Sequence, residues 1–166
     1  MKKIILYSVL VFYFMITGFY SEPEYYREYR PVFMAREEME ASVKLDGPRT
    51  ITDPGKIYIK DNLILINEKY RGIHVIDNTI PEEPDKFAFI HIDGCIDMAM
   101  NGNVLYADNA VDLIALTIGK NMDGIHVTSR TRNVFPELIA PDGRGLDEKE
   151  VMARPDNTIL VRWEKR

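Results

Sequence analysis

The chain has 166 residues, of which 46% are hydrophobic, and a formal net charge of −5 at pH 7. This length allows one core and hardly two independent domains, so we expect one domain plus a targeting segment. An acidic chain without a cluster of Lys and Arg lacks the positive surface that nucleic-acid binding requires, which argues against a nucleic acid partner. The one cysteine, Cys95, excludes an internal disulfide and is expected to be a buried apolar residue.

The first 21 residues have the form of a secretory signal. Lys2 and Lys3 precede an uncharged, mostly apolar run over residues 4–20, which corresponds to a basic n-region followed by an apolar h-region. An A-x-A-like cleavage site is missing, and the run is at the short limit of a spanning helix, so an uncleaved anchor and an N-terminal core element are the alternatives. We expect an exported protein in the periplasm, the outer membrane or at the cell surface, with membrane contact only through this segment.

Residues 22–54 are expected to form a linker that contains one short helix. The stretch 21–33 combines acids, two prolines and a cluster of tyrosines, a composition typical of a segment that becomes ordered only near the domain. Residues 34–43 place methionines on one side of a helix and glutamates on the other, and therefore predict a helix.

From Gly55 onward, short apolar runs rich in Ile, Val, Phe and Tyr are separated by Gly, Asn, Asp or Pro. This pattern predicts strands, among them 57–60, 63–67, 72–77 and 86–92. Several of these runs are apolar at consecutive positions, which is typical of sheets that are covered on both faces. The sequence therefore predicts an all-β domain over residues 55–166.

A shift of 41 residues aligns 61–67 with 102–108 and 72–77 with 113–118. A period of about 40 residues that carries four short strands is typical of a propeller blade. We expect repeats at 55–92 and 95–131 and a partial third repeat at 152–166. The residues assigned structural roles in the repeat motif are Gly72, Ile73, Val75, Ile76, Asp77, Asn103, Leu105, Asp108 and Leu113.

The motif itself resembles a known repeat. IHVID at 73–77, followed by NTIPEEP, resembles the LVIVD repeat, and residues 31–163 look like exported LVIVD-repeat proteins that are common in Bacteroidetes and their relatives. The matching stretches are RPVFMAREEMEASV, GKIYIKDNLILINEKYRGIHVIDNTIPEEP, AFIHIDG, IDMAMNGNVLYADNAVDLIALTI and NVFPE.

This resemblance implies an exported, β-propeller-like protein of unassigned biochemical function, and it brings no catalytic residues. The chain departs from the family in three ways: it lacks a lipobox cysteine, Ile118 occupies the place of the closing acid in the second repeat, and relatives are often longer. The incomplete third repeat predicts an open stack of sheets, an assembly of several copies, or a truncated product.

Three histidines, His74, His91 and His126, lie in predicted strands with similar neighbours. Three histidines can hold zinc with one position open. Because they belong to third and fourth strands of their repeats, convergence is not expected, and neither a metal nor another cofactor is assigned.

The acids Asp93, Asp97, Asp108 and Asp112 are spread over the second repeat and could act as acid and base or bind calcium. Turn formation beside Gly94 and Asn109 explains two of them without a ligand. Residues 141–150 resemble a calcium loop, but Arg144 and Leu146 stand where oxygen ligands would be needed, so a long loop between repeats is the simpler interpretation.

The sequence therefore favours an exported, non-catalytic repeat module, a cell-envelope or surface scaffold that binds a protein or glycan partner through its loops. The first alternative is a structural component that forms homo-oligomers by strand addition at an open sheet edge. A truncated remnant and a propeller hydrolase are the further alternatives.

Overall fold

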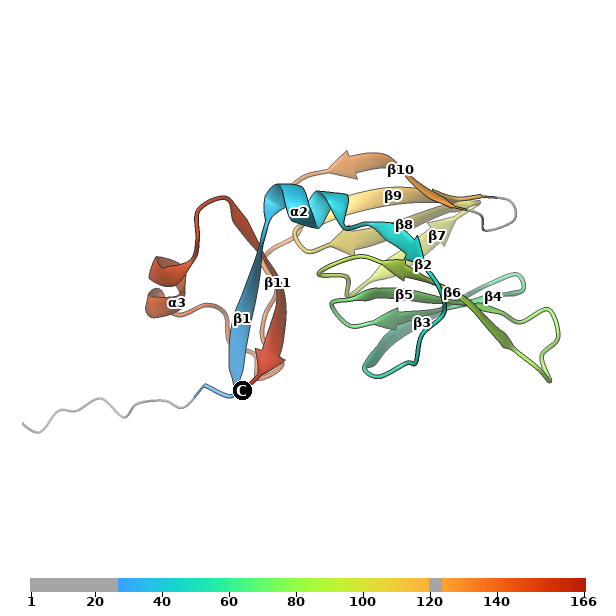
Figure 1. Cartoon of the computed structure of the whole chain (residues 1–166), viewed down its shortest axis with the longest axis horizontal. Helices are drawn as coiled ribbons and strands as arrows, with labels where there is room; N and C mark the ends of the chain where they lie inside the picture. The colour runs from blue at the N-terminus through green and yellow to red at the C-terminus, as the bar shows by residue number, and fades with distance from the viewer. Residues whose placement is uncertain (1–26, 120–123) are drawn as a thin grey trace, which may run out of the picture.

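The computed structural model describes residues 27–119 and 124–166. The signal or anchor segment predicted at 1–21 lies outside these residues. Within them the chain is mostly β, with three antiparallel sheets and two short helices, which confirms the all-β class (Figure 1). In this part of the chain no helix is both long enough and apolar enough to cross a membrane.

The first sheet has five strands in the order β2-β6-β5-β4-β3. Its last four strands are joined in sequence as an antiparallel meander, called the first meander below, and the strands predicted from 57 to 92 all lie in it. The bounds are β2 Lys44–Asp46, β3 Pro54–Lys60, β4 Leu63–Glu68, β5 Gly72–Asp77 and β6 Asp85–His91.

The second sheet has four strands in the order β10-β9-β8-β7 and forms the second meander. Its two central strands lie where the sequence alignment expected them. The bounds are β7 Met98–Asn101, β8 Val104–Asn109, β9 Asp112–Ile118 and β10 Ile125–Thr131.

The two meanders share their strand register. Tyr58 pairs with Leu65 in the first meander, and Ala99 pairs with Tyr106 in the second, each 41 residues later. The turns after β3 and β7 each hold two residues, and the first residue of each has a positive φ, 52° at Asp61 and 58° at Gly102. A register shift interrupts the last strand pair of both meanders at corresponding places.

The pairing corrects one part of the sequence alignment. The connection between β8 and β9 is one residue shorter than that between β4 and β5, since Asn109 pairs with Asp112 where Glu68 pairs with Gly72. Leu113 is therefore the counterpart of Ile73 and not of Gly72. By the same register Thr117, not Ile118, takes the place of Asp77.

The described part of the segment predicted as a linker, residues 27–54, is ordered and carries strands. β1 (Tyr29–Ala35) pairs along its whole length with β11 (Thr158–Lys165) in a separate two-stranded sheet. The predicted helix 34–43 is shorter, because the first two of these residues belong to β1, and α2 spans Arg36–Ala41. The predicted loop 141–150 ends in a helix, α3 (Glu148–Ala153), which begins with a capping box between Asp147 and Glu150.

The main core lies between the two meanders, which stack face to face on the right of Figure 1. Leu65, Ile73 and Val75 of the first meander share it with Leu105 and Leu116 of the second. Complete burial of one such side chain contributes about 1.5–3 kcal/mol, so this interface is a major source of stability. The two-stranded sheet lies beside one end of the stack, with α2 next to it (Figure 1).

Candidate functional site

A groove of about 520 Å³ lies between the outer face of the second meander and residues 135–139. Ala99 of β7, Tyr106 of β8 and Leu113 of β9 line it from the sheet, and Phe135 and Ile139 line it from the opposite side. Tyr106 is 36% exposed and Ile139 is 60% exposed. The groove thus offers aromatic and aliphatic surface to solvent, which is typical of a binding site.

Hydrogen bonds fix the wall of the groove opposite the sheet. The amides of Val134 and Phe135 both donate to the carbonyl of Val111, at 2.8 and 3.0 Å. At the other end of this segment, the indole Nε1 of Trp163 donates to the carbonyl of Leu138 at 3.1 Å. Leu138 is buried with Trp163 in a small apolar cluster. The groove is therefore preformed by hydrogen bonds from the Val111 carbonyl and the Trp163 indole, which belong to two other parts of the chain.

The carboxylates at the groove have structural partners. The Oδ1 atom of Asp108 accepts from the amides of Ile96 and Asp97, at 2.9 and 2.8 Å. Burial raises the pKa of Asp108, although the two amide hydrogen bonds oppose that rise. Asp97 forms an ion pair with Lys56 at 2.5 Å, which connects the second meander to β3. Asp108 thus holds the turn before β7, and Asp97 contributes to the contact between the meanders.

Cys95 lies next to this turn and is completely buried as a free thiol. Burial raises the pKa of the thiol well above its ordinary value, and the neighbouring Asp108 raises it further. The thiolate, which is the nucleophilic form, is thus strongly disfavoured. The buried apolar position expected for Cys95 is confirmed.

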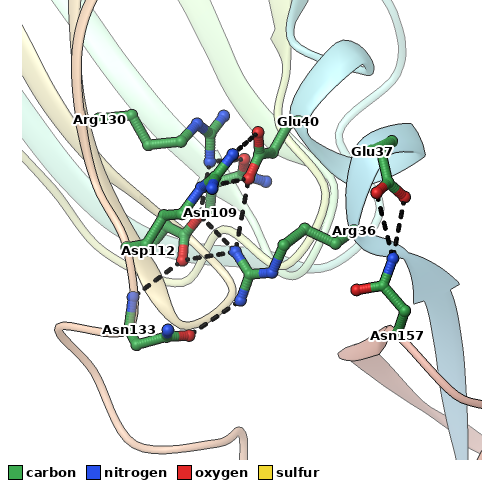
Figure 2. Close-up of polar contacts among 9 residues, drawn as sticks. Arg36, Glu37, Glu40, Asn109, Asp112, Arg130, Asn133 and Asn157 are labelled. Atoms are coloured by element: carbon green, nitrogen blue, oxygen red, sulfur yellow. Dashed lines mark hydrogen bonds and ion pairs between the residues drawn. The ribbon is translucent and has the colours of Figure 1, made fainter.

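A second polar cluster joins α2 to the second meander (Figure 2). The fully buried carboxylate of Asp112 pairs with Arg36 at 3.1 Å and with Arg130 at 2.9 Å, and it accepts from the amide of Asn133 at 3.0 Å. Burial alone would raise the pKa of Asp112, but these three partners lower it. A charge pair of this kind is costly to break and offers no open position for a ligand, so we assign it a structural role.

A third cluster surrounds Glu68 in the first meander. Its carboxylate accepts from the amides of Thr52 and Asp53, from the Thr52 hydroxyl, and from His74 Nε2 at 3.0 Å. Glu68 and His74 are both buried. The His74 ring packs edge-on against the Phe89 ring, with the two ring centroids 4.8 Å apart. This cluster fastens residues 52–53 to the sheet.

The three histidines do not share a hydrogen-bond partner. His74 bonds Glu68, His91 bonds Asp93 at 3.1 Å, and His126 is exposed on β10. Among the described residues, no three His, Cys, Asp or Glu side chains are grouped so that they could hold a metal ion. The acids Asp93, Asp97, Asp108 and Asp112 are likewise each engaged by different partners.

The motif residues of the first meander occupy structural positions. Ile73, Val75 and Ile76 are buried, and Asp77 Oδ1 accepts from the Thr79 amide at 2.8 Å, as a turn-forming aspartate does. Gly72 has a φ of 139°, and a Cβ there would lie 2.0 Å from the carbonyl oxygen of Ile90. Gly72 is thus required by a close backbone approach within the sheet, and not by a turn before it.

In the second meander, Leu105 and Asp108 are buried, Leu113 is half-buried at the groove, and Asn103 is an exposed turn residue. The groove was not predicted from the sequence. One signal for it was present: Tyr106 stands at the register position of Leu65, so a residue with a polar tip replaces a fully buried aliphatic one.

Comparison of the chain with family models, with curated proteins and with solved structures finds no match.

Proposed function

We propose that this protein is an exported, non-catalytic repeat module that binds a partner through the groove on its second meander. The exposed apolar groove is the observation that carries this proposal. Its wall is preformed, and Tyr106, Phe135 and Ile139 present rigid aromatic and branched side chains that can bury area at low entropic cost. The partner belongs to the protein or glycan class, because aromatic side chains pack against both apolar side chains and sugar rings.

Two further observations support the repeat part of the proposal. The meanders have the same register, the same type of turn after their first strands and a register shift at corresponding places. Each meander has four sequential antiparallel strands, as a propeller blade does. We therefore interpret them as two blade-like units of the LVIVD type, and residues 1–21 as their export segment.

The non-catalytic part follows from the partners of the groove acids. A general acid or base needs a carboxylate that is free to reach a substrate proton. Asp108 is bonded to two main-chain amides, Asp97 to Lys56, and Glu137 pairs with Arg154 at 2.6 Å. Each of these carboxylates is bonded within the fold, so we consider a hydrolase the least favoured alternative.

Library selection tests the role of the groove. A random peptide library displayed on phage and a glycan array are screened against the full chain, at concentrations low enough to keep it dilute. We expect binders whose signal falls about tenfold or more with Tyr106→Asp, because a charge would enter the apolar floor. The matched control is Met152→Asp, which introduces the same charge at an exposed apolar residue of α3. The groove would be refuted as the binding surface by binders that bind both variants with equal affinity. A screen that yields no binders would refute it as well.

Export is tested separately. The full coding sequence is expressed in a Gram-negative host, and the intact mass of the protein is measured in the periplasmic and membrane fractions. A mass that lacks roughly the first 21 residues supports a cleaved signal. A full-length protein that stays in the cytoplasmic fraction would contradict export.

A further inference from the structure

The two meanders pack head to tail. The face of the first meander that carries Leu65 and Val75 lies against the face of the second meander that carries Leu105 and Leu116. These are different faces of equivalent units, because Leu65 corresponds in register to Tyr106 and not to Leu105. A packing of this kind joins two unlike surfaces, and each unit keeps one surface of each type.

The unused surface of the second meander is the groove. The counterparts of Leu65, Ile73 and Val75 are Tyr106, Leu113 and Ala115. Tyr106 and Leu113 line the groove from the sheet. The groove therefore corresponds to the very face that the first meander uses to cover its neighbour.

The unused surface of the first meander is a strip of isoleucines, exposed on β3 and half-buried on β4, called the isoleucine strip. Its members are Ile57, Ile59, Ile64 and Ile66, and the strand pairing sets Ile57 beside Ile66 and Ile59 beside Ile64. Ile57 is 63% exposed and Ile59 is 67% exposed. Their register counterparts in the second meander, Met98, Met100, Leu105 and Ala107, all belong to the core between the meanders or pack against it.

We propose that the groove of one copy of this chain receives the isoleucine strip of a second copy, through the same pair of sheet faces that joins the two meanders within one chain. This inference rests on the proposed function of the groove as a binding surface, and it names the partner. The contact is heterologous, so each copy offers one groove and one strip, and copies add in a row or close into a ring.

The charges beside these surfaces fit the same arrangement. Lys56 and Asp97 are 41 residues apart in sequence, and they form an ion pair across the contact between the meanders. When the same contact is repeated between copies, Asp97 beside the groove of one copy meets Lys56 beside the strip of the next. Opposite charges then face each other at the rim, which favours this orientation over a reversed one.

The test uses two blocked variants of the full chain, measured by sedimentation velocity. Wild-type protein is expected to increase in mean mass with concentration. Tyr106→Asp blocks the groove and Ile59→Asp blocks the strip. The association constant of each variant alone should therefore be at least about tenfold lower than that of the wild type. An equal mixture of the two should form a dimer and nothing larger, because one intact groove meets one intact strip.

Controls separate folding from binding. Both substituted residues are partly exposed, so circular dichroism and the thermal midpoint should match those of the wild type, and Met152→Asp should associate as the wild type does. A wild-type chain that stays monomeric at all concentrations would overturn the inference. So would association that both blocked variants retain, which is the result expected for strand addition at a sheet edge.

The outcomes also separate this inference from the proposed function. If the wild-type chain is monomeric and its selected peptides or glycans still need Tyr106, the second copy is refuted as the partner. The groove then remains the binding surface. A monomeric chain without any ligand that depends on Tyr106 would remove both.

Discussion

Replacement of Glu68 by Gln removes one buried charge while it keeps the size of the side chain. In the folded protein this carboxylate accepts hydrogen bonds from Thr52, Asp53 and His74. Burial would raise the pKa of Glu68, but the bonds from the Thr52 hydroxyl and amide, the Asp53 amide and His74 outweigh it and lower the pKa from 4.5 to about 2. The charged form is therefore the one that the fold stabilises.

The size of the effect follows from the pKa shift. A folded-state pKa of about 2 against an ordinary value of 4.5 corresponds to about 3 kcal/mol of stability at neutral pH. Because the folded pKa is lowered, this contribution is complete above the unfolded pKa and is lost as the pH falls toward 2. At pH 3 about half of it remains. The Gln variant has no such titration, so its deficit relative to the wild type should shrink with decreasing pH.

Urea denaturation monitored by circular dichroism gives the free energy of unfolding of both proteins at pH 7 and at pH 3. We expect Glu68→Gln to be less stable by about 3 kcal/mol at pH 7 and by about 1.5 kcal/mol at pH 3. The exposed Glu83 provides the control, since Glu83→Gln should differ from the wild type by less than about 0.5 kcal/mol at either pH. A deficit for Glu68→Gln that is small at pH 7, or equal at both values, would refute the reasoning.

Three other predictions concern the core and the polar clusters. Val75→Asp should abolish soluble folding, because it buries an unpaired charge, and an unchanged thermal midpoint would contradict the buried strand. Asp112→Ala should lower the free energy of unfolding by about 3–5 kcal/mol, as it leaves Arg36 and Arg130 without their shared partner; urea denaturation measures this, and a loss below about 1 kcal/mol would contradict it. Cys95 should react with a chromogenic disulfide reagent only in denaturant, and fast reaction of native protein would contradict its burial.

The strands of the meanders could be predicted because their signals are local. Branched and aromatic residues between turn residues define β4 and β5, and Gly72–Asp77 has the bounds that the sequence predicts. The position of Cys95 followed from its apolar neighbours. The slip of one residue in β9 was not visible, because residues 112–118 are apolar enough to match in either frame and only the pairing of Asp112 with Asn109 decides between them.

The rest depended on contacts between distant parts of the chain. β1 has the composition of a linker, and it becomes a strand because β11, more than 120 residues later, supplies its hydrogen-bond partners. The groove could not be predicted for the same reason. Its wall is fixed by the main-chain carbonyl of Val111 and the indole of Trp163, which bond main-chain groups of residues 134–138 that carry no sequence signature.

Isotope-mixed cross-linking tests the head-to-tail account most directly. Full chain labelled with ¹⁵N is mixed with unlabelled chain, treated with a carbodiimide that joins amines to carboxylates at zero length, digested and analysed by mass spectrometry. We predict Lys56–Asp97 linked peptides in which one peptide is labelled and the other is unlabelled. Their amount should rise with protein concentration and fall with Tyr106→Asp. Linked peptides that carry a single label at every concentration would contradict the account, since Lys56 and Asp97 would then meet only within one chain.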